Sequence, residues 1–479
     1  MKLEQDRRQF LRGAALLGAA AAAGGCAGTR LGFGGGGSMA GFRVPPMERI
    51  RVGVVGCGGR GTGGVRRFRQ FGCVEVTALC DTVQAQLDKC QALLVEKGRP
   101  KAKEFTGPDG YRALCESGLC DVVYNTTPIA VHLRVARAAM LAGCHVMTEV
   151  ELTPGLEGNW ELVELAEKTR RHCMMLENCC YGEDELLMFN MARGGVLGDI
   201  THGEAGYIHD CRSLRYPADG QKDDPWRRAE YAARTRMPGN GYPTHGLGPL
   251  AQAMNVNRGD RFEYLVSMSA RGAGLREYAV GRFGADSVYG RERFFTTDMN
   301  TTLIRTAMGN TIMLQNNEDT PRVYTRMNLL QGSRGIVRTY PLRIAFCDKV
   351  TDHFSKFFDE AKVAEVREKY GSKLWKKLGA YAKNQGHGGM DFMMDARWIY
   401  CLHTGLPLDI DVYDSATWSV LAGLTEESVN RRSAPVDVPD FTRGGWKTAK
   451  PLPVLDMDVA KLGLERFGAA DNDSEYRKL

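Results

Sequence analysis

The sequence predicts an α/β chain, with an N-terminal Rossmann-type, doubly wound parallel sheet followed by an α+β domain that contains a large, mostly antiparallel sheet. A valine-rich run at residues 50–55 leads directly into a glycine-rich loop. Apolar strand-like runs then alternate with helix-like segments to about residue 178, which is typical of a parallel sheet. From about residue 200, short β-rich segments are separated by Gly, Asn and Asp turns, as in antiparallel sheets.

The glycine-rich loop has the spacing of a dinucleotide-binding fingerprint. Gly56 allows a tight turn, Gly58 lets a pyrophosphate approach, and Gly61 permits close helix–strand packing. A second apolar run, 74–80, ends in Asp81, about 20 residues past the last glycine, where a carboxylate meets an adenosine ribose. The loop alone is a weak signal, because the chain has 57 glycines. Strand, loop and acid in this order favour a dinucleotide site.

The rest of the first half follows from apolar periodicity. We expect helices over 60–71, 83–97, 131–142 and 159–171, and strands over 120–128, 145–150 and 173–176. Ligands of such sheets bind at the carboxyl ends of the strands. The polar residues expected at that edge are Arg60, Asp81, 126–132, Glu149, Glu177 and Asn178.

The second half predicts a sheet with one face covered. Its β-rich segments are 201–208, 262–270, 301–315 and 335–344. Two irregular stretches, 226–245 and 386–391, interrupt these strands. Long irregular loops in a compact domain are often functional, and both stretches keep histidines.

Bulk properties limit the classes of function. A length of 479 residues predicts more than one domain, and 43% hydrophobic with 25% charged residues is ordinary for a soluble globular protein. The net charge of +6 is small and the basic residues are scattered, which argues against nucleic acid as a partner. None of the 14 cysteines forms a Cys-x-x-Cys pair, so we expect no metal site and mostly buried thiols.

The N-terminal segment is typical of a targeting signal. Arg7 and Arg8 precede an Ala/Leu/Gly run that ends at Cys26, which indicates export by the twin-arginine route. The exported protein would be either periplasmic or a membrane-anchored lipoprotein. Two alternatives stay open for Cys26: lipid modification, or cleavage after a small residue. The predicted division is a signal segment at 1–28, a Gly-rich tether at 29–47, an NAD-binding Rossmann domain at 48–178 and a substrate-binding and catalytic α+β domain at 179–479.

Longer motifs carry a family resemblance. The glycine loop, Asn-Thr-Thr-Pro at 125–128 and the strand ending at Glu149 resemble the Gfo/Idh/MocA superfamily. Within it, the chain resembles glycoside hydrolase family 109. That narrower resemblance is carried by Glu-Asn-Cys-Cys-Tyr at 177–181, Tyr-Ile-His-Asp at 207–210, Tyr-Pro-Thr-His-Gly-Leu-Gly-Pro at 242–249 and Asn-Arg-Gly-Asp at 257–260.

The resemblance implies an NAD-dependent exo-glycosidase, typically an α-N-acetylgalactosaminidase. In such an enzyme the hydroxyl on sugar carbon 3 is oxidised, and a base then removes the acidified proton on carbon 2. The glycosidic oxygen leaves by elimination, water adds, and carbon 3 is reduced again with the retained NADH. This route differs from hydrolysis between two carboxylates.

The resemblance also assigns roles to residues. The NAD contacts it implies, beyond the glycines above, are Gly59, Arg60, Asp81, Ile129 to His132, Glu149, Val150 and Asn178. The sugar contacts it implies are Tyr207, Arg227, Tyr242, His245 and Tyr324. The proton-transfer candidates are Glu177, Tyr207, His209 and His245, and the choice of base for carbon 2 stays open among them.

Two other functions were weighed against this one. Sugar dehydrogenases of the superfamily carry Glu-Lys-Pro where this chain has Glu149-Val150-Glu151, and valine cannot transfer the proton that their lysine does. This difference argues against an exported NAD(P)-dependent sugar oxidoreductase. The proton-transfer candidates argue against a non-catalytic sugar-binding lipoprotein. A broad, half-covered sheet also suggests pairing with a second copy of the chain.

Overall fold

The structure is a computed structural model that describes residues 37–216, 237–349, 351–353 and 355–464. The expected signal segment, Cys26 and Arg227 lie outside the described residues. The expected tether is described from residue 37 onward, where Met39 and Val44 are buried and the Met39 amide donates to the Tyr413 hydroxyl at 3.1 Å. Across the described ranges, every helix is too short or too polar to span a bilayer.

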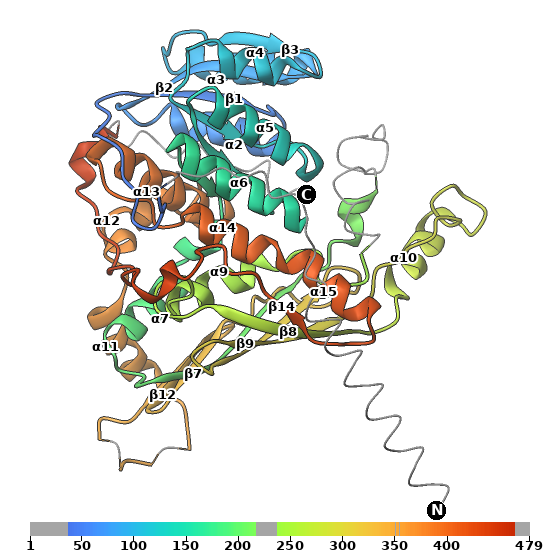
Figure 1. The fold of residues 1–479 in the computed structure, drawn as a ribbon, viewed down its shortest axis with the longest axis vertical. Coiled ribbons are helices and arrows are strands. Elements are labelled where there is room, and N and C mark those ends of the chain that lie inside the picture. The colour runs from blue at the N-terminus through green and yellow to red at the C-terminus, as the bar shows by residue number, and fades with distance from the viewer. Residues whose placement is uncertain (1–36, 217–236, 350, 354, 465–479) are drawn as a thin grey trace, which may run out of the picture. The chain divides into compact units, whose positions relative to one another are not determined.

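The first half forms a six-stranded parallel sheet in the order β3-β2-β1-β4-β5-β6 (Figure 1). This is the doubly wound order, whose direction reverses between β1 and β4 and leaves a binding crevice there. The strands are β1 (Ile50–Val55), β2 (Val74–Asp81), β3 (Lys103–Thr106), β4 (Val122–Asn125), β5 (His145–Thr148) and β6 (Cys173–Met175). The helices are α2 (Gly59–Phe68), α3 (Gln84–Glu96), α4 (Gly110–Glu116), α5 (Ile129–Leu141) and α6 (Leu156–Thr169).

The predicted Rossmann fold is therefore confirmed, with one omission. The sequence predicts 120–128 as the third strand, whereas β3 and α4 precede it and make β4 the fourth. Strand β3 was missed because it is four residues long at the sheet edge, and its Lys-Glu-Phe-Thr sequence has no buried residue. It therefore lacks the apolar run on which the other strands were recognised.

The second half forms an eight-stranded sheet in the order β13-β12-β11-β7-β10-β9-β8-β14. Its pairs are antiparallel except for β7 with β10, so the predicted mostly antiparallel sheet is confirmed. The strands are β7 (Ile200–Ile208), β8 (Phe262–Ser269), β9 (Asn300–Thr306), β10 (Thr311–Asn317), β11 (Leu329–Gly332), β12 (Gly335–Thr339), β13 (Leu342–Phe346) and β14 (Val436–Asp437). The expected β-rich segments 301–315 and 335–344 each correspond to a hairpin of two strands.

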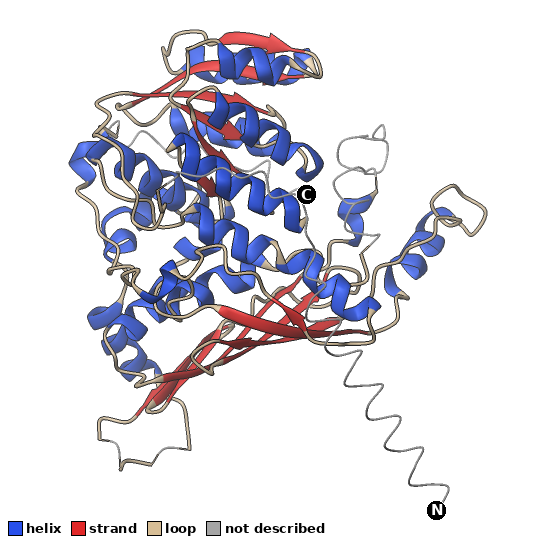
Figure 2. Cartoon of the chain, viewed as in Figure 1, coloured by secondary structure: helices blue, strands red, loops and turns tan. Residues whose placement is uncertain are grey.

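Helices pack on one face of this second sheet (Figure 2). Along β9 the side chain of Ile304 is buried, whereas that of Leu303 is 52% exposed on the opposite face. The elements that build the site are η1 (Asn178–Tyr181), α7 (Glu183–Arg193), α9 (Thr244–Ala253), η3 (His387–Gly389) and α13 (Met390–Thr404). Further helices are α10 (Gly274–Phe283), α11 (Glu360–Tyr370), α12 (Lys373–Ala382), α14 (Val412–Ser419) and α15 (Leu421–Asn430).

A buried hydrophobic cluster extends through both halves of the described chain. It joins Rossmann residues such as Phe68 to residues of the C-terminal helices such as Trp398, whose rings lie 5.7 Å apart. The cysteines of the described residues are free thiols, and all are buried except the half-buried Cys347. The expectation that most cysteines fill the core is confirmed.

Candidate active site

The glycine loop between β1 and α2 has the shape that a dinucleotide needs. Gly56 has a φ of +90°, and a Cβ on Gly61 would lie 1.9 Å from the Gly56 carbonyl oxygen, so both positions require glycine. At Gly58, by contrast, a Cβ would meet no atom within 4 Å. Helix α2 begins there without a side-chain cap, so its first amide groups remain available to an anion. The loop therefore fits a pyrophosphate.

Asp81 lies at the carboxyl end of β2, beside this loop. Its Oδ2 accepts the Cys57 amide at 2.6 Å, and its Oδ1 accepts the Val83 amide at 2.8 Å. Two backbone donors thus hold a half-buried carboxylate at the place expected for a ribose. The sequence-predicted adenosine end of the site is assembled by neighbouring strands of the parallel sheet.

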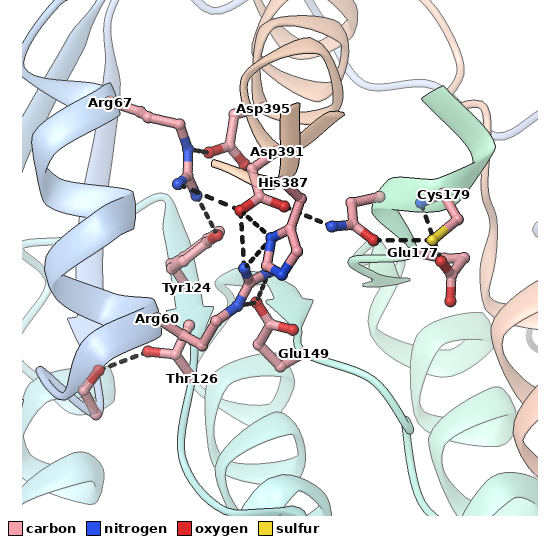
Figure 3. Close-up of polar contacts among 12 residues, drawn as sticks. Arg60, Arg67, Tyr124, Thr126, Glu149, Glu177, Cys179, His387, Asp391 and Asp395 are labelled. Carbon is pink, nitrogen blue, oxygen red and sulfur yellow. Dashed lines mark hydrogen bonds and ion pairs between the residues drawn. The ribbon is translucent and has the colours of Figure 1, made fainter. Parts of the chain in front are cut away.

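The other expected cofactor residues meet around Arg60 (Figure 3). Its Nη2 lies 2.6 Å from Glu149 Oε1, and its Nη1 lies 2.8 Å from Asp391 Oδ2. Asp391 Oδ1 accepts Asn178 Nδ2 at 2.6 Å, which connects a third expected residue to the group. Burial would raise the pKa of Asp391, but Arg60, His387 and Arg67 together hold that pKa well below its usual value.

His132 and Val150 have supporting positions. The His132 ring is buried, with Nδ1 2.7 Å from the Glu151 carbonyl oxygen and Nε2 2.7 Å from the Thr127 carbonyl oxygen. It thereby ties together the segments that follow β4 and β5. Ile129 opens α5 between them, and the buried Val150 offers no proton carrier.

Two of the proton-transfer candidates, Glu177 and His245, contact each other. The Glu177 carboxylate is fully buried, and its oxygens lie 2.9 and 3.0 Å from His245 Nδ1. Burial raises the pKa of Glu177, but the contacts from His245, Thr244 and the Cys179 amide lower it more, so its net pKa lies below the usual value. The ionised carboxylate accepts the Nδ1 hydrogen, and His245 Nε2 faces the Tyr242 hydroxyl at 3.3 Å.

A tyrosine–histidine pair at the end of β7 lies against this group. The Tyr207 hydroxyl is 2.8 Å from His209 Nδ1. Burial raises the pKa of Tyr207 well above its usual value and lowers that of His209, so the phenol keeps its hydrogen and donates it to a neutral imidazole. The Tyr207 ring lies 4.8 Å from the Tyr242 ring and 5.3 Å from the His245 ring.

Two glycines bring these groups together. A Cβ on Gly246 would lie 2.4 Å from the backbone nitrogen of Gly206, so α9 and β7 approach each other with no side chain between them. His245 and Tyr207 are the chain neighbours of these glycines. The close contact of helix and strand therefore places these two proton-transfer candidates beside one another.

Tyr324 completes the aromatic group, with support that sequence reasoning missed. Its ring lies 5.1 Å from the His209 ring, and its hydroxyl accepts Arg326 Nη1 at 2.7 Å. Arg326 is buried and also donates to Glu185 Oε1 at 2.7 Å. No motif identifies this arginine or this glutamate, because the signal is their burial and pairing, which only the fold supplies.

A metal ion has three candidate ligands in this group. Ligand atoms of Glu177, Cys179 and His245 lie within 4.8 Å of one another. Burial raises the pKa of the Cys179 thiol well above its usual value. Since thiolate rather than thiol binds metals, the observed pairing of Glu177 with His245 describes the site better than a metal centre does.

The chain matches two known families over adjoining ranges. Residues 50–177 match the oxidoreductase family with an NAD-binding Rossmann fold, and residues 181–448 match the C-terminal domain of glycosyl hydrolase 109. The chain belongs to glycosyl hydrolase family 109. Family 109 protein 2 of Shewanella sp. (strain ANA-3) is 43% identical over 457 residues, covering 94% of this chain and 99% of the relative. The family 109 protein of Shewanella putrefaciens is 44% identical over 424 residues, covering 87% and 90%.

Solved structures confirm the fold of this family 109 protein. An NAD binding oxidoreductase from Klebsiella pneumoniae aligns with a TM-score of 0.62 at 15% identity, over 82% of this chain and 99% of that one. The WlbA dehydrogenase from Bordetella pertussis, in complex with NADH and UDP-GlcNAcA, aligns with a TM-score of 0.56 at 17% identity, over 83% and 99%. The family 109 chain thus carries an NAD-binding Rossmann domain, and the loop geometry above fits that cofactor.

Proposed function

We propose that this family 109 protein is an exo-glycosidase that releases terminal α-linked N-acetylgalactosamine by oxidation, elimination, addition and reduction, with NAD recycled in the site. One observation carries the proposal: the proton-transfer group and the cofactor group adjoin at consecutive residues. Glu177 bonds to His245, and Asn178 bonds to Asp391 beside Arg60. Acid–base chemistry and hydride transfer can therefore act on one sugar ring.

The same geometry argues against hydrolysis between two carboxylates. That mechanism needs carboxyl groups on both sides of the glycosidic bond. Glu177 is fully buried and its oxygens are engaged by His245 and by the Cys179 amide at 3.0 Å. It is placed to orient a histidine rather than to contact a sugar.

NAD supplies the hydride acceptor and donor for sugar carbon 3 when it is bound. With the Nδ1 hydrogen held by Glu177, Nε2 is the position at which His245 takes up and returns a proton. Tyr207, whose hydroxyl is hydrogen-bonded to His209, is the second proton carrier. Its ring lies with those of Tyr242 and Tyr324 in an aromatic wall next to His245. The proposal assigns His245 to the carbon 2 proton and the Tyr207–His209 pair to the hydroxyl and leaving-group protons.

The sugar preference is supported by the family and by the aromatic wall. The rings of Tyr207, Tyr242 and Tyr324 present flat apolar surfaces that end in hydroxyl groups. Such surfaces suit the apolar C–H face and the hydroxyl groups of a pyranose ring. In the proposed function, the substrate is a glycan or small glycoside with a terminal α-N-acetylgalactosamine.

A chromogenic α-N-acetylgalactosaminide tests the proposal. Purified protein, first without and then with added NAD, should release the chromophore with no net NADH. In deuterium oxide, the released sugar should carry deuterium at carbon 2. Net NADH would instead indicate a sugar oxidoreductase, absence of both products would indicate a binding protein, and chromophore release without deuterium would refute the elimination step.

We also infer export by the twin-arginine route. The support is the Arg7-Arg8 pair before an Ala- and Gly-rich run. This route carries folded proteins, which suits an enzyme that must arrive with its cofactor. Replacing both arginines by lysine should retain the protein in the cytoplasm, as measured by fractionation, and palmitate labelling lost in a Cys26→Ala variant would show whether Cys26 carries lipid.

A further inference from the structure

We propose that Asp391 is a positioning residue that keeps NAD in the protein, by holding Arg60 and Asn178 in one fixed arrangement. Arg60 lies in the range 50–177 that matches the NAD-binding Rossmann family and Asn178 directly follows that range, whereas Asp391 is the second residue of α13 in the C-terminal half. Only the reason why NAD must be retained rests on the proposed function. Its test measures cofactor release and needs no glycosidase activity.

The contacts of Asp391 use both of its carboxylate oxygens. Oδ1 accepts Asn178 Nδ2 at 2.6 Å, and Oδ2 accepts Arg60 Nη1 at 2.8 Å and His387 Nδ1 at 2.9 Å (Figure 3). Arg67 Nη1 lies 3.8 Å from Oδ2. The residue is 1% exposed, so it cannot serve as a surface charge. A single buried carboxylate therefore joins α2, η1 and α13.

The local backbone is shaped to place this carboxylate. Gly386 has a φ of +92°, and a Cβ there would lie 2.5 Å from Asp391 Oδ2. Gly389, directly before α13, has a φ of +104°. The glycine turn wraps over the carboxylate in a conformation that other residues rarely adopt. The sequence predicts an irregular, functional loop over 386–391, whereas the structure forms η3 and the start of α13 there.

The negative charge of Asp391 connects Arg60 to the C-terminal half. Arg60 is shared between Glu149 in the Rossmann half and Asp391 in the C-terminal half. Without the second carboxylate, Arg60 keeps its ion pair with Glu149 but loses the one with the C-terminal half, and Asn178 Nδ2 loses a charged acceptor. An enzyme that borrows a hydride and returns it fails if NADH leaves between the two steps, so a contact that slows release has a direct use.

The test compares Asp391→Asn with Asp395→Asn. Asp395 lies one turn further along α13, is equally buried, and pairs with Arg67 at 2.6 Å, but it makes no described contact with Arg60 or Asn178. Bound nucleotide is measured after purification, and the NADH release rate is measured by fluorescence on mixing with excess NAD. We expect D391N to release NADH about 10- to 100-fold faster, since it loses a charged hydrogen bond, and D395N to stay within about threefold of the parent.

Thermal unfolding of both apoproteins separates positioning from general destabilisation. If D391N is destabilised no more than D395N and yet loses NAD faster, the proposal holds. Release from D391N at the parental rate overturns the proposal. So does faster release that D395N reproduces at equal loss of stability.

A second variant, Arg60→Met, tests the proposal if D391N does not fold. Arg60 has a partly exposed side chain, so Arg60→Met should fold, and it should release NADH with a rate increase similar to that of D391N. Where D391N does fold, the effects in the double variant should be less than multiplicative, because the Arg60–Asp391 contact is absent from both single variants. Multiplying effects, or a parental release rate in R60M, would show that Asp391 does not act through Arg60.

Discussion

Replacement of Glu177 by glutamine tests how the proton-transfer group is oriented. Glu177 is fully buried and accepts hydrogens from His245 Nδ1 at 2.9 Å and from the Cys179 amide at 3.0 Å. Glutamine has nearly the same shape but lacks the negative charge. Its amide nitrogen also donates a hydrogen, so a single oxygen remains for the donors of His245, Thr244 and the Cys179 amide. The substitution therefore leaves the packing intact and removes the group that fixes the His245 hydrogen on Nδ1.

The expected magnitude follows from these contacts. A hydrogen bond to a charged group contributes about 1.5–3 kcal/mol, which corresponds to about 10- to 150-fold in rate. Where the glutamine amide donates to His245 Nδ1, the imidazole hydrogen moves to Nε2 and the base is lost, so the upper end of that range is expected. Because Glu177 does not reach the surface of the site, KM should change by less than about threefold.

The assay is release of chromophore from an α-N-acetylgalactosaminide, with kcat and KM measured separately. Nucleotide content serves as the control, and it should equal that of the parent because Asn178 and Asp391 are untouched. Acid unfolding gives a further readout. The lowered pKa of Glu177 stabilises the fold above about pH 4.5, and this contribution is lost as the pH falls below that value, so E177Q should unfold with a weaker pH dependence there. An unchanged kcat at full NAD content would refute the assigned role.

Three further outcomes are expected. Arg326→Met should lower the free energy of unfolding by about 3–5 kcal/mol in urea titrations, because the buried Glu185 carboxylate loses its cation. A decrease of less than about 1 kcal/mol would contradict the importance of this ion pair. His145 Nδ1 accepts the His172 amide, and burial lowers the pKa of His145 to about 3, so the stability of the fold should decline as the pH falls from 6.5 toward 3. In melting curves, His145→Asn should weaken that decline. An unaltered decline would contradict the role given to His145. Gly61→Ala should abolish NAD copurification, since its methyl group would lie 1.9 Å from a loop carbonyl oxygen; parental nucleotide content would show that the loop can adjust.

Elements with strong apolar runs were predictable from the sequence. Strand β2 was expected at the residues where it lies, Val74–Asp81, because its alternate side chains are buried in the sheet. Strand β3 was not, because an exposed edge strand of four residues carries no such pattern. The segment 301–315 was recognisable as β-rich, but its division into β9 and β10 was not, because the turn near Gly309 interrupts the β-rich composition only briefly. Strand pairing was beyond reach, since it depends on contacts between distant residues.

The residues of the candidate site also differ in whether the sequence could indicate them. Tyr242 and His245 lie in one short motif, so the sequence could indicate them together. Arg326 and Glu185 are 141 residues apart and acquire meaning only through their ion pair. Asp391 had no partner in its own stretch except His387, and its contacts to Arg60 and Asn178 come from distant elements. Buried charges reveal their roles only when the fold shows what neutralises them.

In the proposed function, two kinds of chemistry are kept close but separate because they depend on consecutive residues. Glu177 reaches α9, where it orients His245, and Asn178 reaches α13, where it meets Asp391. Because both follow the buried strand β6, the distance between the proton carriers and the cofactor residues is set by one peptide unit rather than by a mobile loop. Proton transfer and cofactor retention should therefore fail independently. E177Q should turn over slowly with its NAD in place, and D391N should lose its NAD with the Glu177–His245 contact intact.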